Sequence, residues 1–205
     1  MLADMYLKEF LDKTASNAPV PGGGSIAALS GAIAAALTEM VANLTIGKKK
    51  YLAVEDEMKE IAATFTEYRN KLVQDIDRDS DAFNEVMAAF KLPKETEEEV
   101  ATRNSVIEEA TKKATLVPLE VARDTYKMLA TIEVVVEKGN QNAVSDGAVA
   151  AMMARTAVLS ALYNVEINLG SLQDEAFVAE MKKEVAELRK QVVEAEKRVL
   201  EKVKL

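Results

Sequence analysis

Apolar residues recur along most of the chain at steps of three and four, the spacing of one face of an α-helix. No segment shows the strict apolar and polar alternation that predicts a β-strand. The pattern predicts helices over residues 4–16, 25–46, 53–90, 145–169 and 174–203. It also predicts a helix from 96 to about 117 and its resumption from 119 to about 138. Because no repeat or low-complexity linker separates them, we predict an all-α fold, a single-domain bundle of about six helices formed by residues 1–205.

Residues that cap or break helices mark several boundaries. Ser25 directly precedes the Ala-rich segment and is the predicted N-cap of its helix. Thr96 and Glu99 fit the T-x-x-E capping box, which predicts a helix start at that point. Pro118 lacks a backbone N–H and is expected to kink or break the helix that contains it.

The segment from Ile26 to Ile46 is the most hydrophobic and is nearly long enough to span a bilayer. It is built mostly of Ala and carries the polar residues Ser30, Thr38, Glu39 and Asn43. We therefore expect a buried central helix and no membrane contact. The first residues are acidic and follow helical spacing, unlike a signal peptide, so a cytoplasmic protein is expected.

Composition narrows the possible chemistry. The formal net charge of −8 works against nucleic acid as a partner of the surface as a whole. The chain has no Cys and no His, so it lacks thiolate ligands as well as the commonest zinc ligand and general base. We expect no metal site and no tightly bound cofactor, and acid-base chemistry must fall to Asp, Glu, Lys, Tyr or the ligand itself.

Three consecutive glycines, Gly22, Gly23 and Gly24, lie between Pro21 and Ser25 directly before a helix. Glycines at a helix N-terminus allow several backbone N–H groups to point at one anion, such as a carboxylate or phosphate. They also allow two helices to approach closely in a tight turn. Geometry alone favours the two interpretations equally.

A cationic cluster, Lys48, Lys49 and Lys50, follows the Ala-rich helix. Cations at a helix C-terminus are favourable in themselves, which provides a purely structural explanation. The helix separates the cluster from the glycines by about 30 Å, so one ligand does not easily contact both within a monomer. A neighbouring subunit or a long anionic tail would bring them into one site.

Asp75, Asp77, Asp79 and Asp81 form a dense run of carboxylates in the third helix. Asp79 lies on the apolar stripe of that helix, where burial would raise its pKa toward the range useful for proton transfer. It is the first catalytic candidate. The alternative is a capped or salt-bridged structural Asp, with Arg78 or Arg103 nearby.

Amides and one further carboxylate gather near the last two predicted turns. Asn140, Asn142 and Asp146 surround the start of a helix, with Asn142 or Ser145 as its expected cap. Asn164 and Asn168 are four residues apart on a face of small residues and need hydrogen-bond partners there. A facing helix or a ligand rich in heteroatoms, such as a pterin ring, would supply them.

Five blocks of sequence closely resemble one known family. They are APVPGGGSIAALSGAIAAAL, MVANLTIGKKKY, DIDRDSDAFNEVMAAFKLPK, VPLEVA and GNQNAVSDGAVAA with NVEINL beyond it. The chain resembles, over nearly its whole length, the cyclodeaminase/cyclohydrolase family. That family includes the C-terminal domain of formiminotransferase-cyclodeaminase and stand-alone methenyltetrahydrofolate cyclohydrolases.

The resemblance implies a homodimeric enzyme that acts on one-carbon units carried by tetrahydrofolate. It implies cyclodeamination of 5-formiminotetrahydrofolate, which forms 5,10-methenyltetrahydrofolate and ammonia. The alternatives are hydrolysis of the methenyl form to 10-formyltetrahydrofolate, or a non-catalytic protein that binds folate or assembles with partners. A cyclodeaminase of this length would need a separate formiminotransferase to supply its substrate.

The family motifs also imply a set of ligand-contacting residues. They are Pro21, Gly22, Gly23, Gly24, Ser25, Asp77, Asp79, Asn140, Asn142, Asp146, Asn164 and Asn168, with Lys48, Lys49 and Lys50 suited to the glutamate tail. Among them, Asp79, Asp146 and Asp77 are the catalytic candidates. Asp79 is the expected general acid and base, and Asp146 a second carboxylate that orients the pterin or a water.

Overall fold

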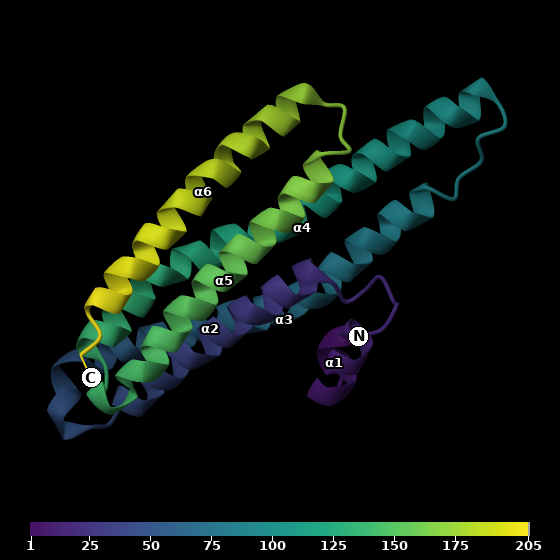
Figure 1. Cartoon of the computed structure of the whole chain (residues 1–205). Coiled ribbons are helices and arrows are strands. Elements are labelled where there is room, and N and C mark those ends of the chain that lie inside the picture. Colours follow the sequence, from purple (N-terminus) through teal and green to yellow (C-terminus); the bar gives the residue numbers. More distant parts are fainter. Residues whose placement is uncertain (205) are drawn as a thin grey trace.

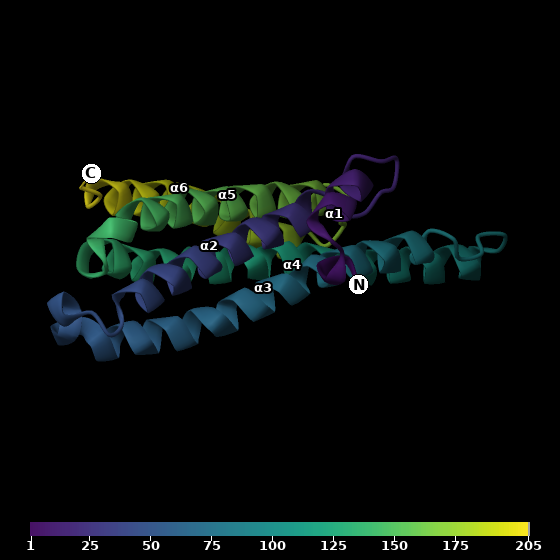
Figure 2. The same ribbon diagram turned by 90° about the horizontal axis from the view of Figure 1, so that it is seen from below.

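Helices are the only regular elements in the part of the chain that the computed structural model describes, residues 1–204. The elements are η1 (Leu2–Asp4), α1 (Leu7–Thr14), α2 (Gly23–Thr45), η2 (Lys49–Val54), α3 (Glu55–Ala89), α4 (Glu97–Lys138), η3 (Gln141–Ala143), α5 (Val144–Leu169) and α6 (Glu175–Glu201), where η denotes a short 3-10 helix. The five long helices lie roughly alongside one another, and α3 and α4 extend beyond the others at one end (Figures 1 and 2). The predicted all-α bundle is confirmed.

Helix α2 occupies the middle of the bundle because its side chains are small. Ala27, Ala28, Ala34, Ala35 and Ala42 are fully buried, and α2 packs against α3, α4 and α5. At Gly31 the helix lies close to α4, since a Cβ there would lie 2.8 Å from Thr125 Oγ1. A larger residue at this position would push α2 away from α4.

One of the predicted helix boundaries is confirmed and two need correction. The capping box is confirmed, since Thr96 Oγ1 accepts from Glu99 N at 3.2 Å and Glu99 Oε2 accepts from Thr96 N at 3.1 Å. Ser25 is not an N-cap, because α2 already begins at Gly23 and places Ser25 in its first turn. Pro118 does not break its helix, because α4 continues through it.

The start of α5 also differs from the prediction. Its N-cap position is Ala143, so neither Asn142 nor Ser145 caps this helix. Asn140 instead caps the short helix η3 before it, by accepting a hydrogen bond from Asn142 N at 3.1 Å.

Two segments are long and apolar enough to cross a membrane by length and hydropathy alone, Gly23–Thr45 and Gln141–Leu169. In the bundle, 61% of the most apolar stretch of the first and 44% of that of the second is buried. The central helix of a soluble bundle passes the same test, so these segments do not by themselves indicate membrane insertion.

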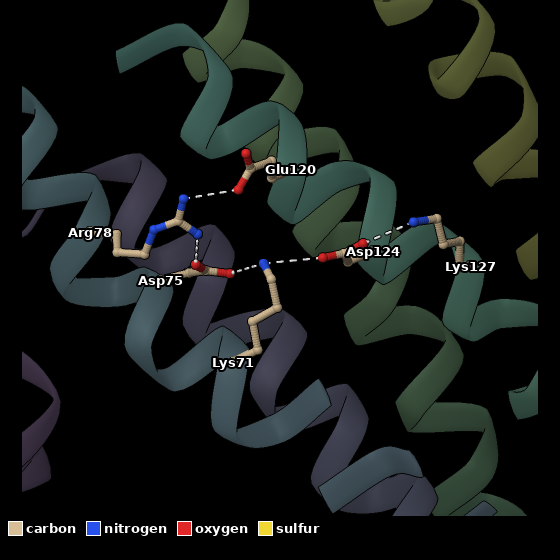
Figure 3. A network of polar contacts seen from close by, with 6 residues as sticks. All are labelled: Lys71, Asp75, Arg78, Glu120, Asp124 and Lys127. Carbon is tan, nitrogen blue, oxygen red and sulfur yellow. Dashed lines mark hydrogen bonds and ion pairs between the residues drawn. The ribbon is translucent and has the colours of Figure 1, made fainter. Parts of the chain in front are cut away.

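A network of charged side chains joins α3 to α4 (Figure 3). Asp75 is fully buried and accepts from Lys71 Nζ at 2.9 Å and from Arg78 Nη1 at 2.5 Å. Arg78 continues to Glu120 at 2.9 Å, and Lys71 continues to Asp124 at 3.1 Å. Because a buried carboxylate is tolerated only when paired, this network fixes the turn of α3 that precedes Asp79.

We expect Asp75→Ala to lower the free energy of unfolding by about 2–4 kcal/mol, because both cations lose their buried partner. Urea unfolding followed by circular dichroism measures this loss. The matched control is Asp81→Ala, an exposed carboxylate of the same helix, which should change stability little. Equal stability of the two variants would show that the network does not hold the helices together.

Candidate active site

A cavity of about 310 Å³ lies where the first turn of α2 meets α3, α4 and the end of α5. Its lining residues come from five parts of the chain. They are Pro19, Val20, Gly22, Gly23, Gly24, Asp79, Phe83, Val86, Phe90, Thr111, Ala114, Asn164, Ile167, Asn168 and Ser171. The cavity therefore unites the glycines, Asp79 and the asparagine pair, as the sequence predicts.

The glycines let two polar side chains reach the first turn of α2. A Cβ on Gly24 would overlap the Asp79 carboxylate, and a Cβ on Gly23 would lie 3.1 Å from Asn164 Nδ2. The backbone N–H of Ser25 donates to Asp79. The glycines therefore permit close packing, and the carboxylate at this helix N-terminus is the protein's own Asp79, whereas binding of a ligand anion by the glycines stays a prediction.

Burial raises the pKa of the Asp79 carboxyl, whereas hydrogen bonds from the Ser25 hydroxyl and backbone N–H act in the opposite direction. Ser25 Oγ lies 3.0 Å from Asp79 Oδ2 and also contacts Ile76 O and Ser80 Oγ, each at 3.1 Å. A hydroxyl both donates and accepts, so Ser25 can hydrogen-bond the charged and the protonated form of Asp79.

Of the structural alternative, the salt-bridged form is wrong, whereas the capped form is met, because Asp79 accepts hydrogen bonds from Ser25 in the first turn of α2. Arg78 pairs with Asp75 and Glu120, and Arg103 donates to Phe90 O at 3.1 Å. No Lys or Arg within residues 1–204 forms an ion pair with Asp79. Within residues 1–204, the charged form of Asp79 is therefore stabilised by hydrogen bonds from Ser25 and not by a paired cation.

The two asparagines line the cavity, and the nitrogen of each side-chain amide is already bonded. Asn164 Nδ2 donates to Ser160 O at 2.8 Å, and Asn168 Nδ2 donates to Ala114 O at 2.9 Å. Across the described chain, neither Oδ1 accepts a hydrogen bond. Both amides are thus anchored by their nitrogens, with their oxygens available to a ligand.

The sequence did not identify the apolar wall of the cavity as part of the site. Phe83, Val86 and Phe90 follow Asp79 at four, seven and eleven residues on the same face of α3. In the sequence, this apolar face is typical of a helix packed in the core. Only the fold shows that its last part borders a cavity. Ile167 completes the wall and is 75% exposed, three residues beyond Asn164.

Asp77 and Pro21 do not line the cavity. Asp77 accepts from the backbone N–H groups of Leu2 at 2.5 Å and Ala3 at 3.2 Å, so its carboxylate fixes η1 onto α3. This contact occupies both of its oxygens. Pro21 belongs to the loop before α2, beside the lining residues Val20 and Gly22.

The remaining predicted residues lie at the opposite end of α2 and α5, roughly 30 Å from the cavity by helix length. Asn140 joins the end of α2, with its Nδ2 donating to Leu44 O at 2.9 Å. Asn142 is exposed, and Asp146 is half-buried in the first turn of α5. One chain therefore does not bring these residues to Asp79.

The lysine cluster lies at this second end and is exposed. Lys50 borders a second cavity of about 290 Å³ together with Lys138, Lys202 and Lys204. Lys138 pairs with Glu57 and Lys202 with Glu137, at 2.8 and 3.3 Å. The local charge is cationic although the whole chain is acidic.

The first cavity combines the elements needed for proton transfer to a bound heterocycle. It offers one carboxyl group with a raised pKa, two amide oxygens and an apolar wall against which a ring can lie. Within residues 1–204, no three Asp or Glu side chains are placed to hold a metal ion.

Comparison with known proteins gives a consistent result. The family model described as formiminotransferase-cyclodeaminase matches residues 6–187. A methenyltetrahydrofolate cyclohydrolase of Methylorubrum extorquens is 46% identical over 185 residues, which cover 90% of this chain and 89% of that protein. The formimidoyltransferase-cyclodeaminase of Rattus norvegicus is 32% identical over 90% of this chain, which spans only 34% of that longer protein.

The fold has a close match among solved structures. The crystal structure of a formiminotetrahydrofolate cyclodeaminase from Thermotoga maritima superposes with a TM-score of 0.88 at 36% sequence identity, over 99% of this chain and 98% of that one. Sequence and fold therefore agree over nearly the whole chain, and the protein belongs to the formiminotransferase-cyclodeaminase family.

Proposed function

We propose that this chain is a methenyltetrahydrofolate cyclohydrolase, which hydrolyses 5,10-methenyltetrahydrofolate to 10-formyltetrahydrofolate. The observation that carries the proposal is Asp79, a carboxyl group with a raised pKa in a cavity walled by amides and apolar side chains. The 46% identity to a cyclohydrolase over nearly the full length of both proteins favours this reaction within the family.

In the proposed mechanism, Asp79 carries one proton from the attacking water to N5 of the substrate. Its carboxylate takes a proton from water as the water oxygen bonds to the methenyl carbon, which gives a neutral tetrahedral carbon. The protonated Asp79 then donates to N5 as the bond from N5 to that carbon breaks. The hydroxyl proton leaves to solvent, and the formyl group remains on N10.

Cyclodeamination of 5-formiminotetrahydrofolate is the second candidate, supported by the full-length likeness to the Thermotoga maritima cyclodeaminase. Here N10 attacks the carbon of the protonated formimino group, which turns its nitrogen into an amino group, and Asp79 takes the N10 proton. Asp79 then gives this proton to the amino nitrogen, which leaves as ammonia, and the positive charge remains on the methenyl product. Both reactions need the same single proton carrier.

The purified protein should hydrolyse methenyltetrahydrofolate, with loss of the methenyl absorbance above the uncatalysed rate. Release of ammonia from 5-formiminotetrahydrofolate would instead support the second candidate. Asp79→Asn should lower kcat for the active substrate by at least about 100-fold, because it removes the general acid and base.

Asp81→Asn is the matched control, an exposed position two residues away that should keep its activity. Binding of 5-formyltetrahydrofolate without turnover of either substrate would point to a folate-binding protein instead. Near-normal kcat in a folded Asp79→Asn variant would remove Asp79 from the mechanism.

We expect Ser25→Ala to move the acidic limb of the pH profile of kcat/KM to higher pH. The Ser25 hydroxyl stabilises the charged carboxylate, so its loss raises the pKa of Asp79 further. The first step needs the carboxylate, and a higher pKa leaves less of it at a given pH. Ser30→Ala on the same helix should leave the limb unchanged, since Ser30 Oγ bonds only Ile26 O.

The proposal includes a homodimer that packs along α2 and α5. These helices lie side by side, and each carries uncovered apolar side chains: Ile33, Met40 and Leu44 on α2, and Val149, Met152, Tyr163 and Ile167 on α5. Exposed apolar stripes of this length are typical of interfaces. An antiparallel arrangement would bring Lys48 to Lys50 of one subunit to the folate cavity of the other, where they would hold the glutamate tail.

Light scattering should give a mass of twice 22.3 kDa for the wild-type protein. Ile33→Glu combined with Met152→Glu should shift it to the monomer, because both charges would be desolvated at the interface. Val193→Glu on α6, also an exposed apolar position, is the control and should not alter the mass. A wild-type monomer at micromolar concentration would exclude the shared site.

A further inference from the structure

Pro118 interrupts the hydrogen bonding of α4 beside the folate cavity. Proline has no N–H, so it cannot donate to the carbonyl of the residue four positions earlier, Ala114. Pro118 is buried and α4 continues past it to Lys138. The Ala114 carbonyl therefore lacks the donor that a regular helix would supply.

Asn168 supplies the missing donor. Its Nδ2 lies 2.9 Å from Ala114 O, and this bond joins α5 to α4. Both Ala114 and Asn168 line the cavity, so the repaired carbonyl is part of the cavity wall. The missing N–H of Pro118 thus accounts for the position of the Asn168 side-chain amide in the cavity wall.

The bond also determines which end of the Asn168 amide is presented. Because Nδ2 is held by Ala114 O, Oδ1 is the atom left for the cavity. Asn164 is fixed in the same sense by Ser160 O one turn earlier. The pair offers two acceptors four residues apart, which suits a ligand edge with neighbouring N–H donors.

We propose that Pro118 is a positioning residue for ligand binding, which holds the Asn168 amide with its oxygen toward the N–H edge of the pterin ring. The identity of the ligand rests on the proposed function, whereas the coupling of Pro118 to Asn168 does not. An N–H at position 118 would compete for the Ala114 carbonyl. The amide could then rotate and present its donor, which opposes the ligand's donors.

Pro118→Ala should raise KM for the folate substrate about five- to tenfold, the loss expected for one hydrogen bond, with kcat within about twofold. Asn168→Ala should raise KM at least as much. The double variant should show no further increase over Asn168→Ala, because both changes remove the same interaction. Val117→Ala, a half-buried neighbour of Pro118, is the control and should leave KM unchanged.

Additive effects in the double variant would overturn the proposal, as would an unchanged KM in Pro118→Ala. If Pro118 served only the general stability of α4, Val117→Ala and Pro118→Ala would both lower stability. The KM effects of Pro118→Ala and Asn168→Ala would then not be shared in the double variant. Titration with 5-formyltetrahydrofolate gives dissociation constants for the same variants and replaces KM if the wild-type protein turns over neither substrate.

A readout independent of folate is the NMR signal of the Asn168 side-chain amide, assigned by its loss in Asn168→Ala. Its hydrogen exchange should be protected in the wild-type protein and accelerate at least about tenfold in Pro118→Ala, as the bond to Ala114 weakens. Unchanged exchange would refute the coupling itself. Altered exchange without any folate binding by the wild-type protein would support the coupling and refute the proposed function.

Discussion

The closeness with which α2 packs against its neighbours is the constraint on which the fold and the cavity depend. Fully buried alanines and Gly31 let the helix lie between α3, α4 and α5. At the first turn of α2 only glycine fits, because a side chain on Gly24 would displace the Asp79 carboxylate. Packing and chemistry therefore place the same demand on residue size.

That contact sets the environment of Asp79, the proposed proton carrier of a chain without histidine. Burial favours the protonated carboxyl group, while the Ser25 N–H and hydroxyl favour the carboxylate. The two influences act in opposite directions on the pKa of the same carboxyl group, and within the proposed mechanism they would let Asp79 both accept and donate a proton. The buried ion pairs of Asp75 on the preceding turn of α3 keep the helix that carries Asp79 in place (Figure 3).

The division of the predicted site into two ends has a functional meaning within the proposal. The cavity holds the groups suited to a pterin and its one-carbon unit, whereas the lysines suited to an anionic tail lie a helix length away. A second subunit reconciles the two ends. Within the cavity, Pro118 and Asn168 show how a local defect in one helix can be used to orient a side chain of another.

Helical periodicity and capping residues determined the fold class, most helix limits and Asp79 as the outstanding carboxylate, because these features depend on neighbours in sequence. The sequence could not separate Asp77 from Asp79, since only the fold shows that the N–H groups of η1 occupy Asp77. Nor could it show that Pro118 leaves α4 intact, because the compensating donor comes from another helix. Such outcomes depend on which groups meet across helices, and tertiary packing alone decides that.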